Sequence, residues 1–163
     1  MVNLRPLRPT DLARLVELND AAYPAVPITP PEEMTALLGQ ADFTFGVVDE
    51  TDSLLGFLIG LRPGADYASE NYRYFDSRGA DFLYVDRIVI DATVRGAGLG
   101  RMLYDAVFAL ARDEARAEID CEVNLDPPNP QSLAFHDRLG FRRVGEQETK
   151  NGTVTVALLA ALL

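Results

Sequence analysis

Side chains that bind metals or form disulfides are scarce in this sequence. Its 163 residues include one cysteine, Cys121, and one histidine, His136. A single cysteine cannot form a disulfide within the chain, and a lone histidine offers no cluster for a zinc site of the multi-ligand kind. The sequence therefore predicts no metal cofactor.

Positive charge is also scarce. The chain has 15 Lys and Arg residues against 25 Asp and Glu residues, which gives a net charge of −10. Nonspecific binding to a phosphate backbone needs clustered Lys and Arg, so no nucleic-acid partner is expected. A small anionic ligand remains compatible with this balance if its cationic contacts are local, as they would be at Arg95 and Arg101.

Long hydrophobic runs are absent as well. The N-terminal segment Met1–Pro6 lacks the apolar stretch of a secretion signal. The apolar run from Thr153 to Leu163 is far shorter than the ~20 residues that span a bilayer. We therefore expect a cytoplasmic protein with no membrane partner, in which the C-terminal run forms a buried strand.

The remaining pattern indicates one mixed α/β domain over residues 1–163, in which 48% of the residues are hydrophobic. Apolar residues at helical spacing predict helices after Thr10, after the capping-box sequence Thr29–Glu32, from Gly98 to about Arg116, and from Asn129 to Gly140. Alternation and short apolar runs predict strands over 3–7, 43–48, 54–61, 83–90, 118–124, 141–148 and 153–162. Residues 62–81 show neither pattern and are expected to be irregular.

The most informative segment lies between residues 95 and 101. Its sequence, Arg-Gly-Ala-Gly-Leu-Gly-Arg, follows the predicted strand over 83–90 and opens an amphipathic helix. Glycine costs a helix or strand roughly 0.5–1 kcal/mol relative to alanine, so three glycines at this junction need another reason. A strand-to-helix junction presents free backbone N–H groups and the positive end of the helix dipole. The segment is therefore predicted to hold a pyrophosphate.

Two better-known phosphate motifs do not fit this segment. A P-loop requires G-x-x-x-x-G-K followed by Ser or Thr, and no such string occurs. The dinucleotide fingerprint G-x-G-x-x-G is not met either, because the glycines here are Gly96, Gly98 and Gly100. Neither ATP nor NAD is favoured.

The pattern Arg-x-x-Gly-x-Gly over Arg95–Gly100 resembles the acyl-CoA-binding motif of the GNAT superfamily of N-acetyltransferases. The likeness includes the preceding strand, Tyr84–Ile90, and the downstream segment Asn129–Phe141 with its terminal Gly-Phe. The resemblance implies a central, mostly antiparallel sheet, splayed at the strand before the glycine turn and flanked by about four helices. It also implies acetyl-CoA as acyl donor and, because relatives often dimerise, a possible homodimer formed through Val154–Leu163.

The same resemblance assigns CoA contacts. The N–H groups of the glycine turn would hold the pyrophosphate, and backbone groups of the preceding strand would pair with the pantetheine arm. Asn129 would contact the CoA arm, although it is equally suited to be a helix N-cap before proline, and the two roles are compatible. The residues expected to bind CoA are Ile88, Val89, Ile90, Arg95, Gly96, Ala97, Gly98, Leu99, Gly100, Arg101, Asn129 and Phe135.

One candidate for the general acid follows from the resemblance. Many GNAT relatives carry a tyrosine on the last helix near the thioester sulfur, at the position that His136 occupies here. Histidine can donate a proton near neutral pH, so His136 is a candidate to assist thiolate departure. Packing on that helix explains the same residue equally well.

The base has two candidates. A lysine-like amine has a pKa of about 10.4 and must lose a proton before it attacks. Asp86 and Glu122 lie on strands that should flank the site, although each could instead face water or pair with an arginine such as Arg87, leaving water to remove the proton.

The sequence does not identify the acceptor. The aromatic residues of 62–81, with Glu70, Asp76 and Asp81, suit either a pocket for a cationic amine or a solvated loop.

The leading interpretation is an enzyme that transfers an acetyl group from acetyl-CoA to a primary amine of a small molecule or peptide by direct attack. The alternative from another class is a noncatalytic acyl-CoA-binding sensor or interaction module, which would bind CoA without turnover. A dinucleotide-binding oxidoreductase is a third interpretation, and the glycine spacing argues against it.

Overall fold

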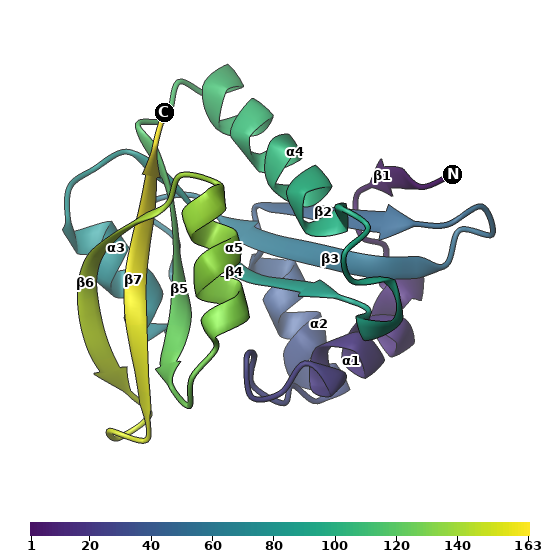
Figure 1. Cartoon of the computed structure of the whole chain (residues 1–163), viewed down its shortest axis with the longest axis horizontal. Coiled ribbons are helices and arrows are strands. Elements are labelled where there is room, and N and C mark those ends of the chain that lie inside the picture. The colour runs from purple at the N-terminus through teal and green to yellow at the C-terminus, as the bar shows by residue number, and fades with distance from the viewer. The chain divides into compact units, whose positions relative to one another are not determined.

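The computed structural model describes residues 1–163 as two compact units (Figure 1). The first unit comprises residues 1–61 and 87–107, and the second comprises 62–86 and 108–163. The fold is mixed α/β, as predicted, with a mostly antiparallel seven-stranded sheet in the order β1-β2-β3-β4-β5-β7-β6. Strand β4, Phe82–Ile90, passes from the second unit into the first. The structure has five α-helices rather than about four.

The first unit is built on antiparallel strands β1 (Asn3–Arg5), β2 (Phe43–Val48) and β3 (Leu54–Leu61), with helices α1 (Leu12–Ala21) and α2 (Pro31–Gln40). Helix α1 packs on α2 and on β3, and its inward residue Leu15 is fully buried. Gly56 in β3 allows a close approach of β4, because a Cβ there would lie 2.8 Å from the Val89 carbonyl oxygen. Helix α4 (Leu99–Asp113) begins in this unit.

The second unit contains α3 (Glu70–Ser77), β5 (Glu118–Asp126), α5 (Pro130–Arg138), β6 (Arg142–Thr149) and β7 (Val154–Leu162). Helix α3 packs on β5 and β6, and α5 packs on β5. In Figure 1, α3 lies behind these strands and α5 in front of them. Strands β4 and β5 pair in parallel only over Phe82–Tyr84, so their pairing stops where the sheet was expected to splay.

Helix α3 is the largest difference from the sequence prediction, which left residues 62–81 irregular. Its start is capped by Ser69, whose hydroxyl oxygen accepts a hydrogen bond from the Tyr72 N–H at 3.2 Å. Tyr72 and Phe75, one helical turn apart, are 1% and 0% exposed. The prediction was wrong because only two apolar positions share the buried face, which is too short a pattern to reveal a helix.

Two predicted helix caps also differ. Thr10 lies within a 3-10 turn over Pro9–Asp11, and the Asp11 carboxylate instead accepts from the Arg8 N–H at 2.7 Å. Thr29 forms no capping box, because its hydroxyl donates to the Pro27 carbonyl oxygen at 2.9 Å. Helix α2 begins at Pro31, a residue suited to the first helical position because its missing N–H has no partner there in any case.

The C-terminal run forms the buried strand that was predicted. Strand β7 pairs with β5 on one edge and β6 on the other, and its residues 156–161 are buried. With both edges occupied, β7 cannot pair with a further strand. None of the helices combines the length and the apolar character needed to traverse a bilayer.

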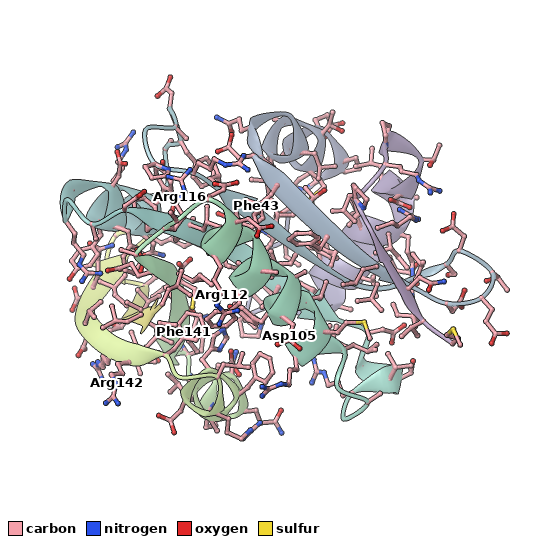
Figure 2. The ribbon with its side chains drawn as sticks, turned by 90° about the horizontal axis from the view of Figure 1, so that it is seen from above. Phe43, Asp105, Arg112, Arg116, Phe141 and Arg142 are labelled. Atoms are coloured by element: carbon pink, nitrogen blue, oxygen red, sulfur yellow. The ribbon has the colours of Figure 1, made fainter.

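The Gly-Phe pair at the end of the downstream motif has a packing role. Gly140 has a φ of +94°, the left-handed conformation in which helices commonly end. The buried ring of Phe141 then lies 5.2 Å from the His136 ring and 6.4 Å from the Phe108 ring. Arg112 covers Phe108 with its guanidinium carbon 5.6 Å from the ring centroid. Figure 2 labels Arg112 and Phe141 in this region. These contacts join the end of α5 to the end of α4.

Asp120 is a buried acid inside the second unit. It is 0% exposed, and neither of its carboxylate oxygens has a hydrogen-bond partner. Burial first, and then the neighbouring Glu118 side chain, raise the pKa of Asp120 to about 9. Glu118 itself pairs with Arg78 at 2.9 Å. Asp120 is therefore protonated in the folded protein at neutral pH.

This arrangement predicts a pH dependence of stability. Because the folded pKa of Asp120 lies far above the ordinary value of 3.8, its favourable contribution is complete below about pH 4 and is lost as the pH rises towards 9. Asp120→Asn should therefore gain stability relative to the wild type with each step from pH 5 to pH 9, measured by urea unfolding. Asp105→Asn, at an exposed position on α4, is the control and should show no such trend. Parallel stability curves for wild type and Asp120→Asn would contradict the assignment.

Candidate functional site

The predicted anion site is a glycine turn in the first unit. After β4, a short 3-10 helix over Ala92–Val94 is capped by Asp91, whose carboxylate accepts from the Thr93 N–H at 2.9 Å. Gly96 and Gly98 follow with φ values of +85° and +79°. Only glycine adopts this left-handed conformation without strain, so the sequence requirement for glycine comes from the backbone. Helix α4 then begins at Leu99.

The backbone donors of this turn are open. No N–H group from Arg95 to Arg101 donates a hydrogen bond within the protein, and the first helical bond of α4 runs from the Met102 N–H to the Gly98 carbonyl oxygen at 3.0 Å. The side chains of Arg95 and Arg101 are exposed and form no ion pair. Free N–H groups at the start of a helix with a cation on each side suit an anion.

The base of the turn is fixed to α1. The Arg14 guanidinium donates to the Asp91 carboxylate at 2.6 Å and to the Leu54 carbonyl oxygen at 3.0 Å. Beside it lies a hollow of about 250 Å³, lined among others by Leu18, Ile90 and Arg95. Ile88 and Ile90 are partly exposed along the end of β4, whereas Val89 between them is 4% exposed. The turn therefore sits on a rigid base.

Both carboxylates proposed as bases lie in one cluster in the second unit, each bonded to a tyrosine. The Tyr67 hydroxyl donates to Asp86 Oδ1 at 2.5 Å, and the Tyr84 hydroxyl donates to Glu122 Oε2 at 2.7 Å. Burial raises the pKa of Tyr84 well above 10, and the negative charges of Glu122 and Asp86 raise it further. Tyr84 is therefore a neutral hydrogen-bond donor throughout the working pH range.

The other residues of the predicted amine pocket have structural roles. Among the aromatic residues of 62–81, Tyr72 and Phe75 belong to the core, and the Tyr74 hydroxyl donates to the Val144 carbonyl oxygen at 3.3 Å. The three acidic residues considered for the pocket have partners within the protein: Glu70 accepts from the Lys150 N–H, Asp76 accepts from the Gly64 N–H, and Asp81 pairs with Arg116. Of the whole segment, Tyr67 is the residue that reaches a candidate base.

His136, the candidate acid, is buried in α5. It is 3% exposed, and its Nδ1 lies 2.7 Å from the Ser132 carbonyl oxygen. This carbonyl can only accept, so the distance assigns the neutral imidazole proton to Nδ1. Burial lowers the pKa of His136 below 6.5, and the bond to Ser132 opposes this only in part. At neutral pH the ring is predominantly uncharged.

Two further predicted residues lie on or next to α5. Asn129 caps the helix, since its side-chain oxygen accepts from the Ser132 N–H at 3.4 Å. Phe135 is partly exposed, and its ring stands edge-on to the His136 ring at 5.3 Å. Cys121 in β5 is 3% exposed, as expected of a packing residue.

Sequence reasoning missed the groups that hold the candidate site in place. Tyr84 and Tyr67 were not linked to Glu122 and Asp86, and Arg87 was considered only as a partner for an acid. In the first unit Arg87 donates to the Asn19 side-chain oxygen and to the Thr29 hydroxyl oxygen, both at 3.0 Å. The one available signal was the dense aromatic composition of residues 62–81.

Comparison with known protein families gives one match of high coverage. The model of the acetyltransferase (GNAT) family matches residues 12–141. Among curated proteins, the peptidyl-lysine N-acetyltransferase YjaB of Salmonella typhimurium is 31% identical over 65 residues, which are 40% of this chain and 40% of that protein. The aligned part thus spans well under half of that relative.

Solved structures of the same architecture cover nearly the whole chain. Arabidopsis thaliana NAA60 in complex with a bisubstrate analogue has a TM-score of 0.79 at 19% identity, covering 99% of this chain and 98% of that one. Ard1 from Thermoplasma volcanium has a TM-score of 0.79 at 15% identity, covering 99% and 97%. At these identities the likeness concerns the fold.

Proposed function

This chain belongs to the GNAT family of acetyltransferases, and we propose that it transfers an acetyl group from acetyl-CoA to a primary amine. The observation that carries the proposal is the run of open backbone N–H groups from Arg95 to Arg101. These groups, with the two flanking arginines, suit the pyrophosphate of CoA in an otherwise acidic protein. NAA60, a structural neighbour, is also known in complex with acetyl-CoA, which supports the same donor here.

Each group of residues has one proposed role in the reaction. The turn holds the pyrophosphate, and backbone groups of Ile88, Val89 and Ile90 pair with the pantetheine arm in the manner of an added strand. We propose that Asn129 and Phe135 contact CoA, as the family resemblance implies. Asp86 or Glu122 removes a proton from the ammonium, and the amine then attacks the thioester carbonyl carbon directly.

The acceptor we propose is an amine on a peptide or a small molecule. The curated relative acts on peptidyl-lysine, and NAA60 is known with a bisubstrate analogue, so a peptide amine is the first candidate. The two carboxylates bonded to Tyr67 and Tyr84 give the second unit local negative charge that favours a cationic acceptor. We also propose a single cytoplasmic domain, and a homodimer would have to form through surfaces other than the edges of β7.

The reaction is tested by thiol release from acetyl-CoA. Spermidine, a lysine peptide with a blocked N-terminus and a lysine-free peptide with a free N-terminus form the acceptor panel. We expect CoA release and a product 42 Da heavier for at least one of them, as acetylation requires. Cys121 is the only cysteine and is buried, so the protein adds little thiol background. Tight CoA binding without turnover on any acceptor would favour the noncatalytic module instead.

The glycine turn is tested by Gly98→Ala. No atom lies within 4 Å of a Cβ placed at this position, so the substitution causes no clash. Its effect comes from the left-handed φ of +79°, a conformation that costs an alanine roughly 1–2 kcal/mol. We expect weaker CoA binding by calorimetry, because the loop must tilt its N–H groups to relieve this strain. Gly39→Ala, at an exposed position in the last turn of α2, is the matched control and should not affect CoA binding, because nothing lies within 4 Å of a Cβ there and its φ is not left-handed. Equal CoA affinity in both variants would contradict the pyrophosphate site.

The role of His136 is tested through pH. If His136 protonates the departing thiolate, it must do so as the charged imidazolium. Because burial lowers the pKa of His136, the imidazolium is lost at a pH below the ordinary 6.5. Turnover should then decline as the pH rises from 5.5 to 7.5, and His136→Phe should abolish that decline. The measurement is the initial rate of thiol release at saturating substrates. If His136→Phe keeps both the turnover and the pH profile of the wild type, the residue only packs on its helix.

A further inference from the structure

One hydrogen bond links the segment before α3 to a candidate base. Tyr67 Oη donates to Asp86 Oδ1 at 2.5 Å, across a separation of 19 residues in sequence. Both side chains are half-buried. A hydroxyl at this distance holds the carboxylate in one orientation.

The position of Tyr67 is fixed by a buried neighbour. Its ring stands edge-on to the Tyr72 ring with centroids 5.8 Å apart. The Tyr72 hydroxyl in turn donates to the Arg62 carbonyl oxygen at 2.6 Å and accepts from the Ala65 N–H at 2.9 Å. Since Tyr72 is 1% exposed, these bonds fasten the segment 62–67 to the core of the second unit. Tyr67 is therefore presented to Asp86 by a rigid support.

The surroundings of Asp86 contain both acids and hydroxyls. Tyr67 reaches it from the segment before α3, and Tyr84 precedes it on β4. Glu122 on β5 accepts the Tyr84 hydroxyl at 2.7 Å. The two carboxylates thus each accept a hydrogen bond from a tyrosine hydroxyl of their own.

We propose that Tyr67 is a positioning residue for acetyl transfer, whose hydroxyl holds the Asp86 carboxylate in the orientation in which it accepts a proton from the acceptor ammonium. This proposal rests on the proposed function. The ammonium gives one proton to Asp86, and the amine nitrogen forms a bond to the thioester carbonyl carbon. The C–S bond breaks with its electron pair on sulfur. The thiolate takes the second nitrogen proton, and Asp86 returns its proton to solvent.

The variant Tyr67→Phe removes the hydroxyl and keeps the ring against Tyr72. With acetyl-CoA and the panel amine that the wild type acetylates fastest, we expect kcat to fall about tenfold, since a hydrogen bond to a charged group is lost. We also expect the KM for the amine to change little, because Tyr67 acts on the carboxylate and not on substrate binding. The dissociation constant of acetyl-CoA should stay the same.

The control and the double variant separate positioning from a general loss of structure. Tyr74→Phe removes a hydroxyl that donates to the Val144 carbonyl oxygen on β6, and it should leave kcat unchanged. Tyr67→Phe added to Asp86→Asn should cause no further loss, because Tyr67 acts only through that carboxylate. A fully additive loss, or an unchanged kcat in Tyr67→Phe, would overturn the proposal.

The failures of the two proposals can be told apart. If the wild type acetylates a panel amine while Asp86→Asn keeps the full rate, Asp86 is not the base and the role of Tyr67 is refuted, whereas the acetyltransferase activity stands. If the wild type acetylates none of the amines but binds CoA, the proposed function fails and the role of Tyr67 fails with it.

Discussion

The open backbone donors at the start of α4 are the constraint on which the rest of the candidate site depends. Backbone N–H groups in folded proteins are almost always paired, and a long unpaired series is tolerated only where water or a ligand can reach it. Here the series is made by two left-handed glycines, Gly96 and Gly98, and is held at its base by Asp91 and Arg14. The turn is thus preorganised for an anion before any ligand arrives.

The candidate bases in the second unit are held by a different kind of contact. Asp86 and Glu122 each receive a hydrogen bond from a tyrosine hydroxyl, which orients a carboxylate without neutralising it. Elsewhere in the same unit, a carboxylate is paired with arginine side chains instead. There Arg62, with Arg116 beside it, lowers the pKa of Glu114 to about 2. A carboxylate held that tightly is too weak a base to take a proton from an amine.

The parts of the structure that could be predicted are those encoded by neighbouring residues. Three glycines between two arginines indicated the turn, and the sequence Asn129-Pro130 indicated the start of α5, which Asn129 caps. The predictions failed where contacts between residues far apart in the sequence determine the local structure. Thr29 binds Arg87 rather than capping α2, across 58 residues, and Tyr67 meets Asp86 only after α3 has folded. Such contacts depend on tertiary packing, which no local pattern records.

The two proton transfers of the proposed reaction differ in difficulty, and the side chains reflect this. An alkyl ammonium with a pKa of about 10.4 keeps its proton at neutral pH, so the amine needs a base. A thiolate, with a pKa of about 8.5 by analogy with cysteine, is stable enough to leave with little help. For the first demand we propose the two tyrosine-bonded carboxylates of the second unit, whereas the one imidazole proposed for the second is buried and predominantly neutral. The arrangement therefore favours a reaction in which removing the proton from the amine, rather than protonating the leaving group, is the step that the protein assists.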